Sequence, residues 1–500
     1  MKTNKLVILA VCVILTFLTA CQRSSDTDMS SIKNDDSFEA AEFTDSVDNL
    51  DNVQETQPNT VPSSNNPDQL IQYSDSFSST DNSVEFRINL ENSVTSKAMP
   101  VVEVVPHYIT EEEAQRVAHV LFGNVDFFEA DPMLAPKYTK GEILERIQRW
   151  SQYTNLEAVG ILLGQEDERT VERLNEAIEE LNALYESAPE DSERTPCQWQ
   201  FQNDSVYTYS PEEAASRDQS SDNEAIMATC KVNGINYRFE AVTRNKEDYK
   251  LNMLNAYINP GNSPLSIDEN IFRARLTRTA PPTEEQIATV QSKAMTMLQE
   301  MDLGEWEINR CYVRSLGETI FEHVICIDAV PVINNVAAAQ QPQITGLSNE
   351  AYSSNYYMTE VNFEFSANGD LIRFTMYSPI DVERVINEDV AILGVNTLLD
   401  KAKEHLALSN SQQYGLQDIY GVLNEKLEAY VEINDMRYGL LREKAPDTDD
   451  SYYYFPGFIL YGTVQSIDSE SKQLYFQSDE SYPLVALNAV DGTVINSVNQ

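Results

Sequence analysis

Apolar and polar residues alternate with two different periods along the chain, and these periods separate predicted strands from predicted helices. The first regular stretch is 84–90, where every second residue is apolar, and an apolar run follows at 101–105. Both predict strands. We expect ordered structure to begin near Val84, since the segment before it has no sustained apolar period.

Three helices are predicted after these strands. Thr110 and Thr139 each stand three residues before a glutamate, which is the pattern of a capping box at a helix start, and the first helix should stop near Gly123. The third helix, from about 167 to 185, carries an apolar stripe at helical spacing. Together they predict an α-rich block.

The pattern then changes to hairpins. Asn233-Gly234 separates two apolar stretches and predicts a tight turn, and 260–282 is a Pro-containing joint before a capped helix at 283–301. Further turns are expected at 368–369 and 491–492, and a helix at 396–408. The remaining predicted strands are 306–315, 321–329, 356–365, 370–377, 422–435, 438–444, 455–467, 474–477 and 484–489.

The predicted fold class is α+β, with a helical N-terminal block followed by antiparallel-sheet modules that each have a packed helix. The pattern divides the chain into residues 1–20 as a signal peptide, 21–83 as a disordered acidic tether, and two α+β domains at 84–260 and 283–500. A helix followed by hairpins recurs, which is weak support for related modules because such turns are common in antiparallel proteins.

The N-terminus resembles a bacterial lipoprotein signal. Lys2 and Lys5 precede an apolar run, and Leu18-Thr19-Ala20-Cys21 ends it. The alternative is a transmembrane helix, but spanning takes about 20 apolar residues and this run is shorter. The resemblance implies cleavage before Cys21, lipid on its sulfur, and anchoring to the outer face of the cell membrane.

The charge balance is strongly acidic. Lys and Arg total 35 and Asp and Glu total 80, for a formal net charge of −45. Such a surface repels phosphate backbones and anionic headgroups, so a nucleic-acid partner is not expected. Solubility explains the acidity, and weak collective binding of divalent cations is the alternative.

Four cysteines remain if Cys12 is cleaved away and Cys21 is lipidated, and their order favours two disulfides. These would join Cys197 to Cys230 and Cys311 to Cys326. If strands 306–315 and 321–329 are joined by a four-residue loop, Cys311 lies directly opposite Cys326. Buried free thiols are the alternative.

No catalytic constellation is visible in the sequence. The four histidines, His107, His119, His323 and His405, match no zinc-protease signature, and no nucleophile elbow, phosphate-binding loop or dinucleotide fingerprint occurs. We therefore predict no catalytic residue, metal ligand or cofactor. The aromatic cluster 452–461 is best explained by core packing, with stacking on a sugar or peptide as the alternative.

The C-terminal segments 396–406 and 483–495 resemble the helix and the closing strand-turn-strand of PepSY-type modules. With the signal and the tether, the chain resembles uncharacterised lipoproteins of clostridial Gram-positive bacteria. This resemblance implies a non-enzymatic binding or regulatory role at the cell envelope, with an envelope protein as partner. The alternatives are an envelope hydrolase that acts on peptide or glycan through dispersed carboxylates, and a solute-binding lipoprotein.

Overall fold

The structure is a computed structural model, and it describes most of the chain from Gln69 onward. The described residues are 69–94, 99–131, 138–153, 155, 157, 168–190, 194–208, 223–246, 249–258, 273, 276–277, 279–316, 322–339, 359–409, 427–445, 451–472, 474–478 and 482–495. The predicted signal peptide, Cys21 and most of the predicted tether lie outside them.

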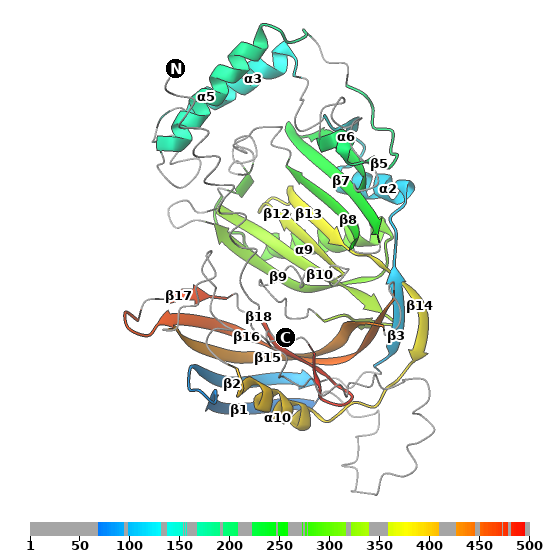
Figure 1. The fold of residues 1–500 in the computed structure, drawn as a ribbon, viewed down its shortest axis with the longest axis vertical. Helices are drawn as coiled ribbons and strands as arrows, with labels where there is room; N and C mark the ends of the chain where they lie inside the picture. Colours follow the sequence, from blue (N-terminus) through cyan, green and yellow to red (C-terminus); the bar gives the residue numbers. More distant parts are fainter. Residues whose placement is uncertain are drawn as a thin grey trace, which may run out of the picture. The chain divides into compact units, whose positions relative to one another are not determined.

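The first of two large sheets has nine strands and joins both ends of the described chain (Figure 1). Its main path runs β1-β2-β15-β16-β18-β19, while β3 pairs with β14 and β16, and β17 pairs with β16. All these strand pairs are antiparallel except β2 with β15. The strands are β1 (Gln69–Ser78), β2 (Val84–Val94), β3 (Val101–Pro106), β14 (Ile380–Asn387), β15 (Leu427–Lys444), β16 (Tyr452–Asp468), β17 (Leu474–Gln477), β18 (Tyr482–Asn488) and β19 (Val494–Ile495).

The second sheet has ten strands, all in antiparallel pairs, and comes from the middle of the chain. Its order is β11-β10-β12-β13-β8-β7-β6-β4, with β9 beside β10 and β5 beside β6. The strands are β4 (Phe128–Glu129), β5 (Gln202–Asn203), β6 (Glu224–Val232), β7 (Ile235–Lys246), β8 (Tyr249–Ile258), β9 (Trp306–Leu316), β10 (Glu322–Ile333), β11 (Val336–Ala337), β12 (Glu360–Phe365) and β13 (Leu371–Tyr377).

The predicted α+β class with antiparallel sheets is confirmed, but the helical N-terminal block is not supported. Helix α2 (Glu111–Phe122) packs with α9 (Glu284–Met301) on one face of the ten-stranded sheet, and α9 is visible behind β12 and β13 in Figure 1. Helices α3 (Lys140–Trp150) and α5 (Glu168–Tyr185) instead pack on each other. The apolar stripe of α2 packs against the sheet. The period of a sequence predicts that a helix has such a stripe, but it does not show which surface the stripe will cover.

The remaining helical elements are short or belong to the other sheet. Helix α10 (Val395–Leu406) packs on the nine-stranded sheet beside β18, so the two segments that resemble PepSY-type modules are neighbours. Helix α6 (Ser205–Thr208) and the 3-10 turn η2 (Ser151–Tyr153) complete the described helices.

Three predicted capping boxes are present in the structure. Thr110, Thr139 and Thr283 each accept a hydrogen bond from the backbone N–H three residues later, and the side chain at that position returns a bond to the cap. Each box satisfies two backbone donors that a helix start leaves free. These local signals place the three helix starts to within a residue.

The chain passes between the two sheets at two adjacent points among the described residues. One passage is 107–110, between β3 and α2, and the other is 378–379, between β13 and β14. They lie side by side, because the backbone N–H of His107 donates to the carbonyl of Pro379 at 2.8 Å. Each sheet therefore contains strands from both of the ranges expected as separate domains, 84–260 and 283–500.

The ordered structure also starts earlier than expected. Residues 69–78 fall within the predicted tether, yet they form β1, paired with β2 along its whole length. The Phe77 ring stacks on Phe86 with centroids 4.8 Å apart, and Lys403 of α10 makes an ion pair with Asp75. This strand contains many serine, aspartate and glutamine residues among its few aromatic and aliphatic ones. Its composition is therefore similar to that of the polar segment before it, which is why it was predicted to be part of the tether.

Candidate functional site

The four described cysteines are free thiols, and their positions do not support the predicted disulfides. In the β9–β10 pair, Cys326 lies opposite Tyr312, and Cys311 lies opposite Ile327. This register differs by one residue from the expected one. Because side chains alternate across a sheet, Cys311 and Cys326 point to opposite faces and cannot bond.

The second predicted disulfide is blocked by an intervening strand. Phe128 of β4 pairs with Thr229 of β6 on one side and with Pro196 on the other. Cys197 and Cys230, which follow these partners, therefore lie on opposite sides of β4. Two strand spacings amount to about 10 Å, whereas a disulfide needs Cα atoms within about 7 Å.

The thiols are protected by burial. Burial raises the pKa of Cys230 to about 12 and that of Cys326 to about 11. The pKa values of Cys197 and Cys311 are also raised, chiefly by burial. A raised pKa leaves little thiolate at neutral pH, so these cysteines are poor nucleophiles and poor metal ligands.

The aromatic cluster before the last strands belongs to the core. Tyr452, Tyr454 and Tyr461 are buried in β16, which confirms packing over stacking on a sugar or peptide. No group of three or more His, Cys, Asp or Glu side chains that could hold a metal ion occurs in the part of the chain that the structure describes.

The most chemically distinctive surface is one face of the ten-stranded sheet, which we call the polar face. Strand pairing aligns its side chains in two adjacent rows that each run from β9 to β7. The first row is Tyr312, Cys326, Glu364, Arg373, Tyr257 and Arg238, and the second is Arg310, Asp328, Asn362, Thr375, Asn255 and Glu240.

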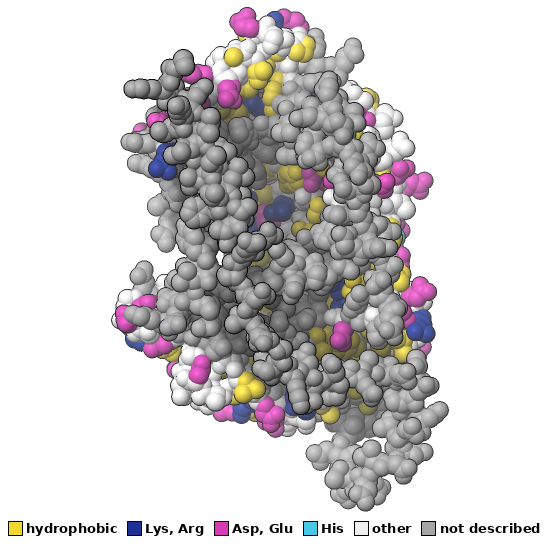
Figure 2. Space-filling view, viewed as in Figure 1, with side chains coloured by type: hydrophobic (Ala, Val, Ile, Leu, Met, Phe, Trp, Pro, Cys, Tyr) yellow, Lys and Arg dark blue, Asp and Glu magenta, His cyan; other side chains and the backbone are white. Residues whose placement is uncertain are grey.

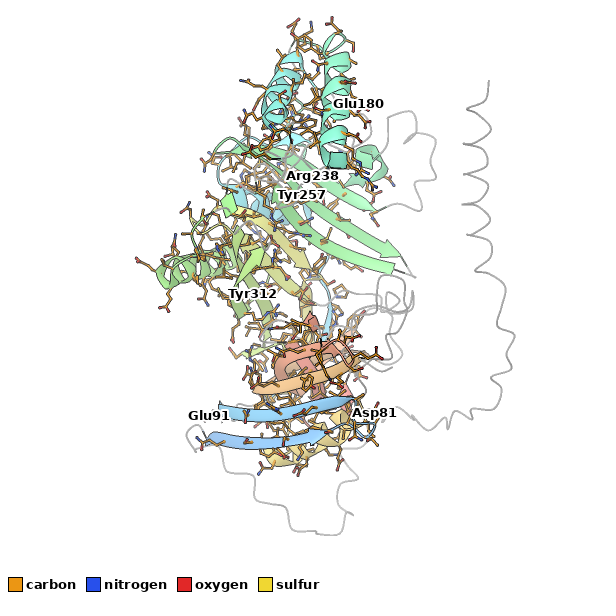
Figure 3. The ribbon with its side chains drawn as sticks, turned by 90° about the vertical axis from the view of Figure 1, so that its left-hand side faces the viewer. Asp81, Glu91, Glu180, Arg238, Tyr257 and Tyr312 are labelled. Atoms are coloured by element: carbon orange, nitrogen blue, oxygen red, sulfur yellow. The ribbon has the colours of Figure 1, made fainter. Side chains whose placement is uncertain are left out.

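The polar face results from alternation along each strand. On β12, Glu360, Asn362 and Glu364 point one way, while Val361 and Phe363 point toward α2 and α9. Figure 2 shows dark-blue, magenta and yellow side chains at the bottom of a hollow over the middle of this sheet. Figure 3 shows the neighbouring side chains of Arg238 and Tyr257, with Tyr312 further along the sheet.

Ion pairs and hydrogen bonds connect the polar face at one end. The Arg238 guanidinium lies 2.8 Å from Glu240 Oε1, and both side chains are largely buried. The Tyr257 hydroxyl donates to the same carboxylate at 2.7 Å, and Asn255 accepts from Thr375 at 3.1 Å. Beyond this group, Tyr207 of α6 packs over the apolar end of the same face.

A second group of charges lies on β9, β10 and β12. Arg310 donates from Nε and Nη2 to Asp328 Oδ2, at 2.8 and 2.6 Å, and its guanidinium lies 4.8 Å from the Tyr312 ring centroid. Burial raises the pKa of Glu360 to about 7, repulsion by Asp328 acts in the same direction, and Arg310 opposes it. Glu360 is thus an acid whose pKa lies near neutral pH, beside the carboxyl group that pairs with Arg310.

Two arginines contact one carboxylate in the first row, and a third is its neighbour on the next strand. Arg314 Nη2 donates to Glu364 Oε1 at 2.6 Å, and Arg273 Nη2 lies 3.5 Å from Oε2 without forming a hydrogen bond. Arg373 is the cross-strand partner of Glu364 and is exposed. The cluster of Arg273, Arg314, Arg373 and Glu364, which we call the arginine cluster, has more positive than negative charge.

One histidine lies where the chain passes between the sheets. His107 Nδ1 is 2.9 Å from Asp381 Oδ2, and Nε2 is 3.1 Å from both carboxylate oxygens of Glu113, the capping glutamate of α2. Burial lowers the pKa of His107, but the hydrogen bonds to Asp381 and Glu113 outweigh it and raise the pKa above its usual value. His107 therefore links the passage at 107–110 to the start of β14, which follows the passage at 378–379.

The polar face was not predicted from the sequence. A usable signal was the alternation Arg310-x-Tyr312-x-Arg314 and Glu360-x-Asn362-x-Glu364, in which charge occupies one side of an otherwise apolar strand. Which strands lie next to each other could not be derived, because β8 pairs with β13 across more than a hundred residues.

Comparisons with known proteins assign no family to the chain. No protein-family model matches it, and no curated protein matches it significantly. No helix within the described ranges is long and apolar enough to cross a membrane.

Proposed function

We propose that this protein is a lipid-anchored, extracytoplasmic lipoprotein that acts as a non-enzymatic binding or regulatory module, and that the polar face is its recognition surface. The observation that carries the proposal is the concentration of half-buried charge on one face of the ten-stranded sheet. The anchor is Cys21, and its lipid holds the protein at the outer face of the membrane.

The polar face is more polar than folding requires. A buried ion pair such as Arg238–Glu240 often stabilises no more than apolar residues of similar volume, because removing two charges from water is costly. The opposite face of the same sheet shows that the chain can supply such residues, with Phe239 and Phe363 in the core. Charge on the polar face is therefore better explained by recognition than by stability.

The PepSY-type resemblance supports a binding role. The two resembling segments pack against each other as α10 and β18–β19, on the sheet that does not carry the polar face. We propose that the nine-stranded sheet is a scaffold and that an envelope protein is the partner of the polar face.

The direct test is capture of partners from intact cells with the lipidated protein as bait and a chemical cross-linker. The test variant combines Arg310→Gln and Asp328→Asn, which removes the charges of one ion pair of the polar face but keeps both side chains polar. The matched control combines Arg87→Gln and Glu85→Gln, an exposed pair on β2. An envelope protein captured by the wild type and the control but lost with the test variant supports the proposal.

Two outcomes count against it. Equal capture by all three proteins moves recognition away from the polar face, and capture of no envelope protein overturns the binding role. Separately, a Cys21→Ala variant should be released from the membrane fraction. Continued retention of that variant contradicts lipid anchoring.

One observation favours the alternative of an envelope hydrolase. Glu360 has its pKa raised to about 7 by burial and by the neighbouring Asp328, and a carboxyl group with a pKa near the working pH can act as a general acid or base. Turnover of peptidoglycan fragments or envelope peptides that disappears in Glu360→Gln and Asp328→Asn would establish this activity. Unchanged turnover in both variants would exclude these two residues.

A further inference from the structure

We propose that the arginine cluster binds the oxyanion group, phosphate or carboxylate, of the ligand that occupies the polar face. This inference rests on the proposed function, because it assumes that the polar face is a recognition surface. It adds the chemical class of the group recognised and the residues that recognise it.

The geometry of the arginine cluster leaves guanidinium groups without a full complement of partners. Arg314 satisfies one oxygen of Glu364, whereas the 3.5 Å contact from Arg273 to the other oxygen is not a hydrogen bond. Arg373 lies directly across the strand pair from Glu364 and has neither a hydrogen bond nor an ion pair with any described residue. One arginine would have sufficed to neutralise this glutamate.

The local charge is opposite to that of the whole chain. Three guanidinium groups and one carboxylate leave an excess of two positive charges, in a protein with a net charge of −45. The nearest acids of the two rows are already engaged, Asp328 by Arg310 and Glu240 by Arg238. Glu360, also on this face of β12, has a pKa of about 7 and is only partly charged at neutral pH, so it offsets the excess only in part.

The chemistry of the cluster fits an oxyanion. A guanidinium presents a planar fork of donors that matches carboxylate and phosphate, and such charge-assisted bonds are stronger than neutral ones. Tyr257 is the cross-strand neighbour of Arg373, and Tyr312 is in the same row on the other side. Burial raises the pKa of Tyr312, which keeps its hydroxyl protonated and able to donate.

The experiment is titration calorimetry on the full chain at low ionic strength, with inorganic phosphate in one arm and succinate in the other. The two arms show which oxyanion is preferred. Arg373→Gln should weaken binding by about tenfold, since it removes a charged donor. Arg87→Gln, an exposed arginine on β2, is the control and should leave binding unchanged.

A second variant reverses the sign of the effect. Glu364→Gln removes the competing carboxylate and frees Arg314, so it should tighten binding of the same anion several-fold. A purely structural role for these residues does not produce opposite changes in Arg373→Gln and Glu364→Gln. Thermal unfolding of each variant checks that the fold is retained.

The inference is overturned if neither anion binds, or if Arg373→Gln and Arg87→Gln weaken binding equally. If neither anion binds but capture still depends on the polar face, this inference fails and the proposed function stands. If capture also fails to depend on the polar face, both fail.

Discussion

The two faces of the ten-stranded sheet are made by the same strands and differ in almost every property. On β12, Val361, Phe363 and Phe365 are fully buried against the helix side, while Glu360 and Glu364 alternate with them on the polar face. The apolar face has close-packed rings, such as Phe363 and Phe374 at 5.0 Å. The comparison teaches that the same strands can supply a packed apolar core on one side of a sheet and a layer of charge on the other.

The largest expected effect comes from breaking the apolar face. Phe363→Ala removes a fully buried ring between Phe365 and Phe374 and should lower the free energy of unfolding by about 3–5 kcal/mol. Chemical denaturation followed by circular dichroism measures it. The control on the other face, Arg373→Gln, should change it by less than about 0.5 kcal/mol, and equal losses would contradict the comparison.

The next effect comes from unbalancing charge on the polar face. Arg238→Met leaves the Glu240 carboxylate largely buried without its cation, which should cost about 3 kcal/mol. Lys472→Met breaks the exposed pair with Glu428 and should leave stability nearly unchanged, because solvent screens the two charges. The difference in denaturation midpoints tests this. A negligible loss in Arg238→Met would mean that the pair is more hydrated than its burial indicates.

Titration of Glu360 gives a smaller effect with a defined pH window. Its folded-state pKa, about 7, lies above the usual value of 4.5, so the folded state holds a proton that the unfolded state releases. Stability should therefore fall as pH rises from about 4.5 to 7, by on the order of 3 kcal/mol.

Glu360→Gln isolates this contribution. Because glutamine does not ionise, the variant should lose most of the decline between those pH values in a series of denaturation curves. The contribution of His107 is fully present below its usual pKa of 6.5 and is lost as pH rises through its raised folded value, and it should remain in the variant. A pH profile identical to that of the wild type would remove Glu360 from this role.

The smallest effect concerns thiol reactivity and leaves stability unchanged. Mass spectrometry under non-reducing conditions should find Cys197, Cys230, Cys311 and Cys326 all alkylated after denaturation. In the folded protein, the partly exposed Cys197 and Cys311 should react before the buried Cys230 and Cys326. Detection of a Cys311–Cys326 disulfide would contradict the register that places them on opposite faces.

Local features of the fold were predictable from the sequence, and non-local ones were not. The capping residues Thr110, Thr139 and Thr283 and the Asn233-Gly234 turn depend on neighbours only a few residues away, and all are present in the structure. The side of the sheet on which Cys311 lies relative to Cys326 depends on the strand register, because a shift of one residue moves a side chain to the opposite face. The sequence does not specify this register.

The candidate site depends on longer distances still. The arginine cluster combines Arg273, Arg314 of β9 and Arg373 of β13, which no local period connects. Charged residues at alternate positions could be seen in each strand by itself. Which of these charges lie next to each other could be told only after the order of the strands in the sheet was known. Pairing of β8 with β13 and of β10 with β12 brings the charges into shared rows.

The parallel pairing of β2 with β15 has a consequence for biosynthesis. The ribosome makes β1 and β2 first, yet their partner emerges only after the entire middle of the polypeptide has been translated. The inserted ten-stranded sheet can assemble in the meantime, whereas the early hairpin waits with an unpaired edge exposed to other chains. Truncated forms that end before Leu427 should therefore aggregate through that hairpin.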